Sequence, residues 1–287
     1  MKNFSQASSS EKGSLRTGYL VWLILILLLI IIIFMNQLLI RQFVYPSPPV
    51  RVQSPAPEPL REIAFQLSDG TKIIGWLDFW ATHKPVVLFS HGNGENLQTV
   101  FDAGTFDQFR AVGVNLLVID YPGYGRSGGK PSEALVLESG TAALKWIKRE
   151  YPDLPVIVCG WSLGAAVAIQ TVSSHPSEVN GLIILSAWTS LPDVARIHFP
   201  GWLVRPLLKE NYNSLAAAKN IRCPVLLIHG SSDPIIPVEQ ARQLAKSFPL
   251  PPDYIEISSA DHNSLMAYPE VWQSIKTFID RLTGINP

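Results

Sequence analysis

A serine between two glycines forms a pattern that is typical of a catalytic nucleophile. Gly160-Trp161-Ser162-Leu163-Gly164 follows the apolar run 156–159 and precedes the helix-forming run 165–171. This G-x-S-x-G pattern between a strand and a helix puts a serine hydroxyl at a sharp, strained turn. A side chain at either flanking glycine would clash with neighbouring backbone. Ser162 is therefore the predicted nucleophile of an acyl-transfer reaction.

A serine hydroxyl is a weak nucleophile and needs a base, which in this type of motif is a histidine that follows an acid in the chain. Of the six histidines, only His262 follows the candidate acid Asp233. Asp233 lies in the segment 229–234, which directly follows the apolar run 225–228, at a strand end where α/β sheets build their sites. Asp261 and Asp193 are alternative acids. The first adjoins His262 on a short backbone, and the second lies outside the regular pattern of strands and helices. We expect Asp233 to orient His262.

The negative charge that develops during acyl transfer requires two hydrogen-bond donors, an oxyanion hole. The first expected donor is the backbone N–H of Leu163, which follows the nucleophile. The second is the N–H of Asn93 in His91-Gly92-Asn93-Gly94, which follows the apolar run 86–90. His91 itself, and His229 before Gly230, are interpreted as structural. Such a reaction needs neither a metal nor an organic cofactor.

The order of apolar and helix-forming segments predicts an α/β fold. A hairpin comes first, and then strands alternate with helices, which indicates a mostly parallel central sheet with helices on both faces. The segment 187–220, after the sixth strand, is too long for a simple crossover and is expected to be a short helical cap. Strands are expected at 62–67, 72–79, 86–90, 115–119, 156–159, 181–185, 225–229 and 254–257, and helices at 95–112, 132–151, 163–174, 238–247 and 269–282.

The first sixty residues have a different composition. The 24 residues 17–40 carry no charge and are rich in Leu and Ile, and about 20 apolar residues suffice for a helix to cross a bilayer. A cleaved signal peptide is the alternative, but its apolar core is shorter and a cleavage site should follow. The predicted domains are an N-terminal tail (1–17), a transmembrane anchor (18–40), a Pro-rich linker (41–59) and a hydrolase domain (60–287).

Charge indicates how this anchor is oriented and which partners are excluded. Lys2, Lys12 and Arg16 precede the apolar segment, whereas Arg41 and Arg51 follow it. This small excess favours a cytoplasmic N-terminus, and hence a single-pass protein whose catalytic domain lies on the non-cytoplasmic side. The whole chain has 23 basic and 23 acidic residues, so no basic excess indicates a nucleic-acid partner.

Two cysteines are too few for a disulfide framework. Cys159 and Cys223 each adjoin an apolar run and are expected to be reduced and packed in the core, although a disulfide between them stays open. Neither spacing suggests a metal site.

Five motifs occur in order along the chain: His91-Gly92-Asn93-Gly94, Asp120-Tyr121-Pro122-Gly123-Tyr124-Gly125-Arg126-Ser127, Gly160-Trp161-Ser162-Leu163-Gly164, His229-Gly230-Ser231-Ser232-Asp233 and Asp261-His262-Asn263. With these motifs the chain resembles the α/β-hydrolase superfamily. It looks most like the small, often membrane-anchored hydrolases of the ABHD12, 13 and 17 type and their bacterial relatives. The resemblance covers residues 61–279 and implies the triad of Ser162, Asp233 and His262. It also implies lipid or acyl-ester substrates.

The cap segment carries apolar residues that bear on the substrate. Phe199 and Trp202 are candidate contacts for an acyl chain, because ligand sites are mostly apolar. Ordinary packing and a membrane-facing patch are the alternatives. The predicted activity is hydrolysis of carboxylic esters or thioesters through an acyl-enzyme. A peptidase or other amide hydrolase on the same fold is the second hypothesis, and a non-catalytic protein of this fold is the third.

Overall fold

The computed structural model describes residues 22–23, 26–27, 44–47, 55–202, 204 and 208–284. The chain divides into two compact units, residues 1–44 and residues 45–287. The predicted anchor at 18–40 lies outside the described residues, except for four helical positions at 22, 23, 26 and 27. In the part of the chain that the structure describes, no helix is both long and apolar enough to cross a membrane.

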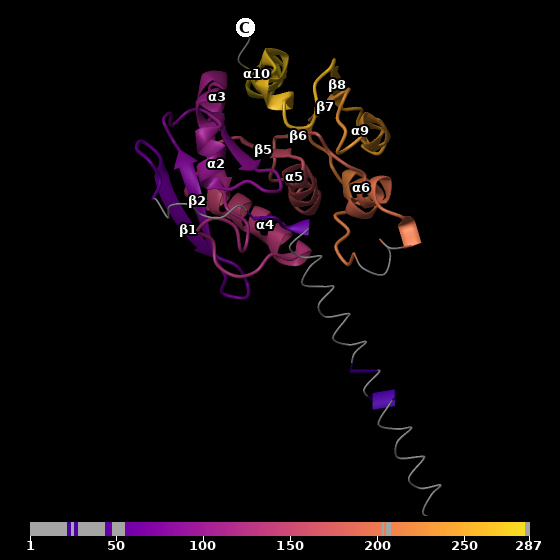
Figure 1. Cartoon of the computed structure of the whole chain (residues 1–287). Coiled ribbons are helices and arrows are strands. Elements are labelled where there is room, and N and C mark those ends of the chain that lie inside the picture. The colour runs from indigo at the N-terminus through magenta and orange to yellow at the C-terminus, as the bar shows by residue number, and fades with distance from the viewer. Residues whose placement is uncertain are drawn as a thin grey trace, which may run out of the picture. The chain divides into compact units, whose positions relative to one another are not determined.

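An eight-stranded sheet forms the centre of the second unit (Figure 1), in the order β1-β2-β4-β3-β5-β6-β7-β8. β1 and β2 form an antiparallel hairpin, β2 is antiparallel to β4, and all other neighbours are parallel. The strands are β1 (Arg61–Gln66), β2 (Lys72–Asp78), β3 (Val86–Ser90), β4 (Asn115–Ile119), β5 (Val156–Trp161), β6 (Gly181–Leu185), β7 (Val225–Gly230) and β8 (Asp253–Ile257).

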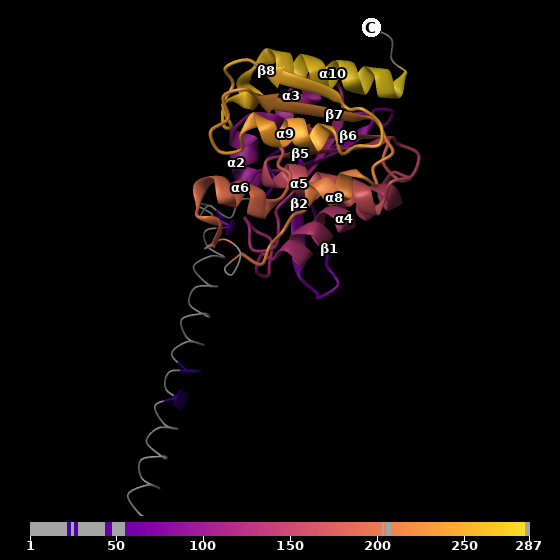
Figure 2. The ribbon, with the colours of Figure 1, turned by 90° about the vertical axis from the view of Figure 1, so that its right-hand side faces the viewer.

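Helices cover both faces of this sheet, because successive side chains of its buried strands point to opposite faces. In β3, Val86 and Leu88 belong to one buried cluster with residues of α4, α5, α8 and α9, whereas Val87 and Phe89 belong to a second cluster with residues of α2, α3 and α10. Figure 2 shows the sheet between these two layers. The helices are α2 (Leu97–Asp102), α3 (Thr105–Val112), α4 (Glu133–Glu150), α5 (Leu163–Ser174), α6 (Leu191–His198), α8 (Ser214–Ala218), α9 (Val238–Ala245) and α10 (Pro269–Thr283), with the 3-10 turn η1 (Leu265–Ala267).

The single helix expected at 95–112 is wrong. Gly104 adopts φ 74°, a left-handed conformation that ends α2 and begins α3. Within the segment 187–220, α6 and α8 lie between β6 and β7. Cys159 and Cys223 are both buried and free, as expected of packed thiols.

The second unit includes part of the predicted linker. Tyr45 is buried, and its hydroxyl lies 2.8 Å from the hydroxyl of Tyr212, which follows the cap helix α6 by 14 residues. Burial raises the pKa of both phenols, so both stay protonated and can share this hydrogen bond. The linker is thus attached to the domain at Tyr45.

Candidate active site

Ser162 stands at the turn between β5 and α5, with φ 57° and ψ −117°. Its N–H donates to the Leu185 carbonyl in β6, which fixes the turn against the sheet. A Cβ on Gly160 would lie 2.0 Å from the Gly164 carbonyl oxygen, and one on Gly164 would lie 1.8 Å from the Ser90 carbonyl oxygen. The expectation that backbone crowding demands glycine at both positions is confirmed.

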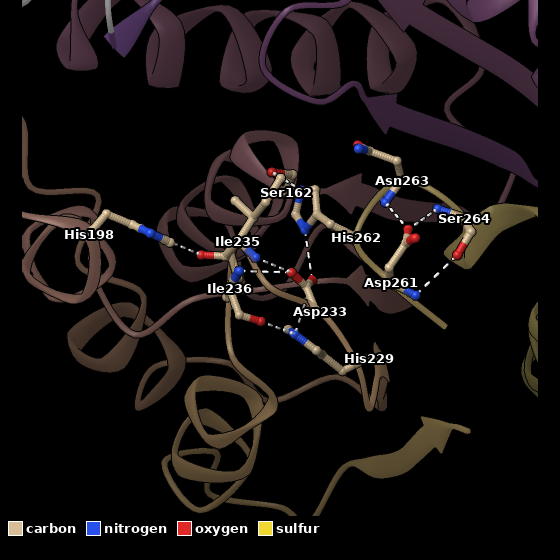
Figure 3. A network of polar contacts seen from close by, with 10 residues as sticks. All are labelled: Ser162, His198, His229, Asp233, Ile235, Ile236, Asp261, His262, Asn263 and Ser264. Atoms are coloured by element: carbon tan, nitrogen blue, oxygen red, sulfur yellow. Dashed lines mark hydrogen bonds and ion pairs between the residues drawn. The ribbon is translucent and has the colours of Figure 1, made fainter. Parts of the chain in front are cut away.

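The fold brings Ser162, His262 and Asp233 into one hydrogen-bonded chain (Figure 3). Ser162 Oγ lies 3.0 Å from His262 Nε2, and His262 Nδ1 lies 2.7 Å from Asp233 Oδ2. A carboxylate only accepts hydrogen bonds, so Nδ1 carries the proton and Nε2 is free to accept the serine proton. All three side chains are buried, although 100 residues separate the serine from the histidine.

Several donors hold Asp233 as a carboxylate. Burial on its own raises the pKa of this carboxyl. Hydrogen bonds from His229 and His262 outweigh that effect and keep the pKa well below its ordinary range. Asp233 Oδ1 also accepts the backbone N–H groups of Ile235 (2.9 Å) and Ile236 (2.8 Å). Asp233 therefore stays ionised at neutral pH and can stabilise a protonated His262.

His229, interpreted as structural from its sequence position, contacts the acid Asp233 at the site. Its Nε2 donates to the Ile236 carbonyl at 2.8 Å and lies 3.4 Å from Asp233 Oδ2. It thus holds both the acid and the loop that follows the acid. His198, at the end of α6, donates from Nε2 to the Ile235 carbonyl and ties the cap to the same loop. The position of His229 at a strand end, four residues before Asp233, is the one available signal.

The loop that carries His262 is ordered by Asp261. Asp261 Oδ1 accepts the N–H groups of Asn263 (2.9 Å) and Ser264 (2.7 Å), and Ser264 Oγ accepts the Asp261 N–H. Asp193, the other alternative acid, accepts hydrogen bonds from Ser190, the N-cap of α6, and from Arg196 within α6. Both alternative carboxylates thus bind groups other than the imidazole of His262, whereas Asp233 contacts that imidazole.

The two expected oxyanion donors come from the loop after β3 and from the start of α5. Leu163 opens α5, and the N–H groups of a helix's first turn have no partner within that helix. In the loop after β3, Glu95 accepts the Gly92 N–H at 2.7 Å, and Asn93 Oδ1 accepts the Tyr124 hydroxyl at 2.7 Å. Glu95 thus occupies the Gly92 N–H, and the Asn93 N–H remains the donor proposed from the sequence.

The contacts of His91 are those expected of a structural residue. Its ring is fully buried, its Nδ1 donates to the Gly92 carbonyl at 2.9 Å, and it packs on Tyr121 with the ring centroids 4.3 Å apart. Burial lowers the pKa of His91 to about 4, so this imidazole is neutral at pH 7. Its contacts belong to the loop rather than to the serine.

The two candidate substrate contacts lie at the end of the cap helix. Phe199 follows α6 and is 40% exposed, and Trp202 is 77% exposed. Neither side chain is enclosed in a formed acyl pocket. Among the described residues, no group of three or more His, Cys, Asp or Glu side chains could hold a metal ion.

Comparison with known proteins identifies relatives of this chain. Residues 81–210 match the family described as serine aminopeptidase, S33. The chain is 30% identical over 210 residues to an uncharacterised protein of Mycobacterium tuberculosis, a match that covers 71% of this chain and 72% of that protein. It is 27% identical over 183 residues to the lysophosphatidylserine lipase ABHD12 of Rattus norvegicus, covering 58% of this chain but only 46% of the lipase.

A solved structure shares the architecture. The esterase Pf2001 of Pyrococcus furiosus superposes with a TM-score of 0.67 at 23% identity, covering 83% of this chain and all of that chain. At this identity the likeness shows the fold alone. Together with the sequence relatives, it establishes that the chain belongs to the α/β-hydrolase superfamily.

Proposed function

We propose that this chain is a serine hydrolase that cleaves carboxylic ester or thioester bonds. The observation that carries the proposal is the hydrogen-bonded chain from Ser162 through His262 to Asp233 at a strained strand-to-helix turn. Nucleophile and base lie within hydrogen-bond reach, and a third group orients the base, which is the arrangement that activates a serine.

The reaction then has two stages. Ser162 Oγ attacks the acyl carbon while His262 Nε2 takes the serine proton, and Asp233 stabilises the imidazolium. The Leu163 and Asn93 N–H groups stabilise the oxyanion. His262 returns the proton to the leaving alcohol or thiol, and the acyl group stays on Ser162. A water molecule then gives its proton to His262 and attacks the acyl carbon. Ser162 leaves with that proton, and a carboxylic acid is released.

We further propose that the substrate is a lipid or another acyl ester. The similarity to a protein named as a lysophosphatidylserine lipase supports this class. So do the exposed apolar residues Phe199 and Trp202 near the loop of Asp233, which are the proposed contacts for an acyl chain. In this proposal residues 18–40 anchor the chain in a membrane, with the domain on the non-cytoplasmic side.

A second candidate is amide hydrolysis, because the matched family is described as a serine aminopeptidase. The same triad can attack an amide, so the site geometry does not exclude it. The two candidates differ in the leaving group.

Kinetics on matched substrates separate these candidates. Purified full-length protein would be assayed on an oxyester, a thioester and an anilide that share one acyl group, and on a lysophospholipid. We expect turnover of the esters and little of the anilide, with a loss of about 10⁴-fold or more in Ser162→Ala. Hydrolysis of the anilide alone would refute the esterase proposal in favour of the amidase.

A further inference from the structure

Four exposed apolar side chains gather beside the candidate site, and we name them the cap patch: Ile197, Phe199, Trp202 and Ile235. Their exposed fractions are 46%, 40%, 77% and 42%. Three of them lie in or just after α6, and the hydrogen bond from His198 to the Ile235 carbonyl joins the fourth to them. Ile235 also lies two residues after Asp233 in the sequence. An apolar group of this kind on a surface marks an interaction site.

The chain enters the second unit at the base of the same helix. Tyr45 binds Tyr212 through their hydroxyls, and the neighbouring Asn211 carbonyl accepts the N–H of Leu191, the first residue of α6. α6 has 8 residues and so is about 12 Å long. Figures 1 and 2 both show the short segment 45–47 on the same side of the domain as α6. The entry point and the cap patch thus lie about one helix length apart.

The length of the connecting chain limits where Tyr45 can be in an anchored protein. The uncharged segment ends at Ile40, five residues before Tyr45. Five residues span at most about 17 Å. If residues 18–40 cross a bilayer, as proposed above, Tyr45 cannot lie far from the lipid headgroups. The face of the domain that carries Tyr45 and α6 must then be close to that membrane.

We propose that the cap patch contacts the lipid bilayer in which residues 18–40 anchor the chain. Trp202 and Phe199 insert at the interface, where aromatic side chains are favoured, and contact the acyl chain of a substrate there rather than inside a pocket. The candidate site then opens beside lipid, and an acyl substrate reaches Ser162 without crossing bulk water. This inference rests on the proposed anchor, but not on the proposed chemistry.

Spin labelling in vesicles tests the contact directly. Full-length Ser162→Ala protein would carry a nitroxide at Trp202→Cys and be reconstituted in phosphatidylcholine and phosphatidylserine vesicles. Leu250→Cys is the matched control: it is 53% exposed and precedes β8, so it lies at the amino end of that strand, whereas the candidate site lies at the carboxyl ends of the strands. The buried native cysteines should not react, which unlabelled parent protein checks.

We expect the label at 202 to be more accessible to oxygen, which dissolves in lipid, than to a water-soluble nickel chelate. The label at 250 should show the reverse ratio. A nickel-accessible label at 202 in membrane-integrated protein would overturn the proposal. Protein extracted from the vesicles by alkaline carbonate would lack the tether and overturn it as well. Neither result depends on turnover, so failure here is distinct from failure of the proposed hydrolysis.

Discussion

The nucleophile turn and the cap contrast in how tightly the chain is packed. At the turn, Gly160 and Gly164 lie so close to backbone that a Cβ on either would come within 2.0 Å of a carbonyl oxygen. At the end of the cap helix, a Cβ on Gly201 would meet its nearest atom at 3.9 Å, and Trp202 is 77% exposed. The proposed chemistry therefore depends on backbone that cannot shift, and the proposed substrate contacts depend on side chains that face outward.

The largest effect on activity should follow from replacing Asp233, the acid of the proposed triad. In Asp233→Asn, the amide no longer holds His262 in the tautomer that accepts the serine proton, and kcat on an ester should fall about 10⁴-fold. Asp261→Asn is the matched control, because Asp261 binds backbone of its own loop. An equal loss in Asp261→Asn would move the role of the acid to that residue.

Two glycine substitutions test the contrast in packing. Gly164→Ala lies in a helix, where alanine is ordinarily favoured, yet its Cβ would overlap the Ser90 carbonyl. We expect it to lower the free energy of unfolding by about 3 kcal/mol or more. Gly201→Ala, also helical, should be neutral or stabilising by up to about 1 kcal/mol. Denaturant unfolding of both variants measures this, and similar values for the two would erase the contrast.

The attachment of the linker through Tyr45 should contribute less to the free energy of unfolding. Tyr45→Phe removes one of two buried hydroxyls that bind each other and deprives Tyr212 of that partner. We expect a loss of about 1–3 kcal/mol in the free energy of unfolding. The double variant Tyr45→Phe/Tyr212→Phe should lose less than the sum of the single variants, because no hydroxyl is then stranded. Additive losses would mean that the two phenols are not coupled.

The smallest effect concerns pH and the loop after β3. Burial raises the pKa of Glu95, so the ionised carboxylate is disfavoured in the folded chain. A raised folded pKa gives stability that is complete below the unfolded pKa and is lost as pH rises through the folded value. Relative to wild type, Glu95→Gln should therefore gain stability between pH 4 and pH 7 in thermal unfolding. A constant difference across that range would contradict the burial of a charge.

The local pattern of apolar runs and turn signals predicts most of the strands and helices. β3, β4 and β6 have the bounds expected from sequence, because each contains an unbroken apolar run next to turn signals. The break at Gly104 was not predictable, since the apolar periodicity continues on both sides of it. Whether a glycine adopts a left-handed conformation within such a run depends on the tertiary packing of α2 and α3.

The sequence does not show which side chains of distant segments contact one another. Ser162, Asp233 and His262 could be selected because their motifs fix residue type, order and strand ends. His229 could not, because only the path of the loop at 233–236 shows that its imidazole meets both Asp233 and the Ile236 carbonyl. Tyr45 forms a hydrogen bond with Tyr212, which lies 167 residues later in a segment without a recognisable motif.

Labelling of the nucleophile tests the central proposal most directly. Membranes with wild-type protein, Ser162→Ala or Ser247→Ala would be treated with a fluorescent fluorophosphonate, and the modified peptide would be identified by mass spectrometry. Ser247 is a partly exposed serine in the second unit and serves as the control. We predict labelling of wild type and Ser247→Ala on the peptide that contains Ser162, and none in Ser162→Ala. Labelling that persists in Ser162→Ala, or a folded wild type that never reacts, would contradict an activated Ser162.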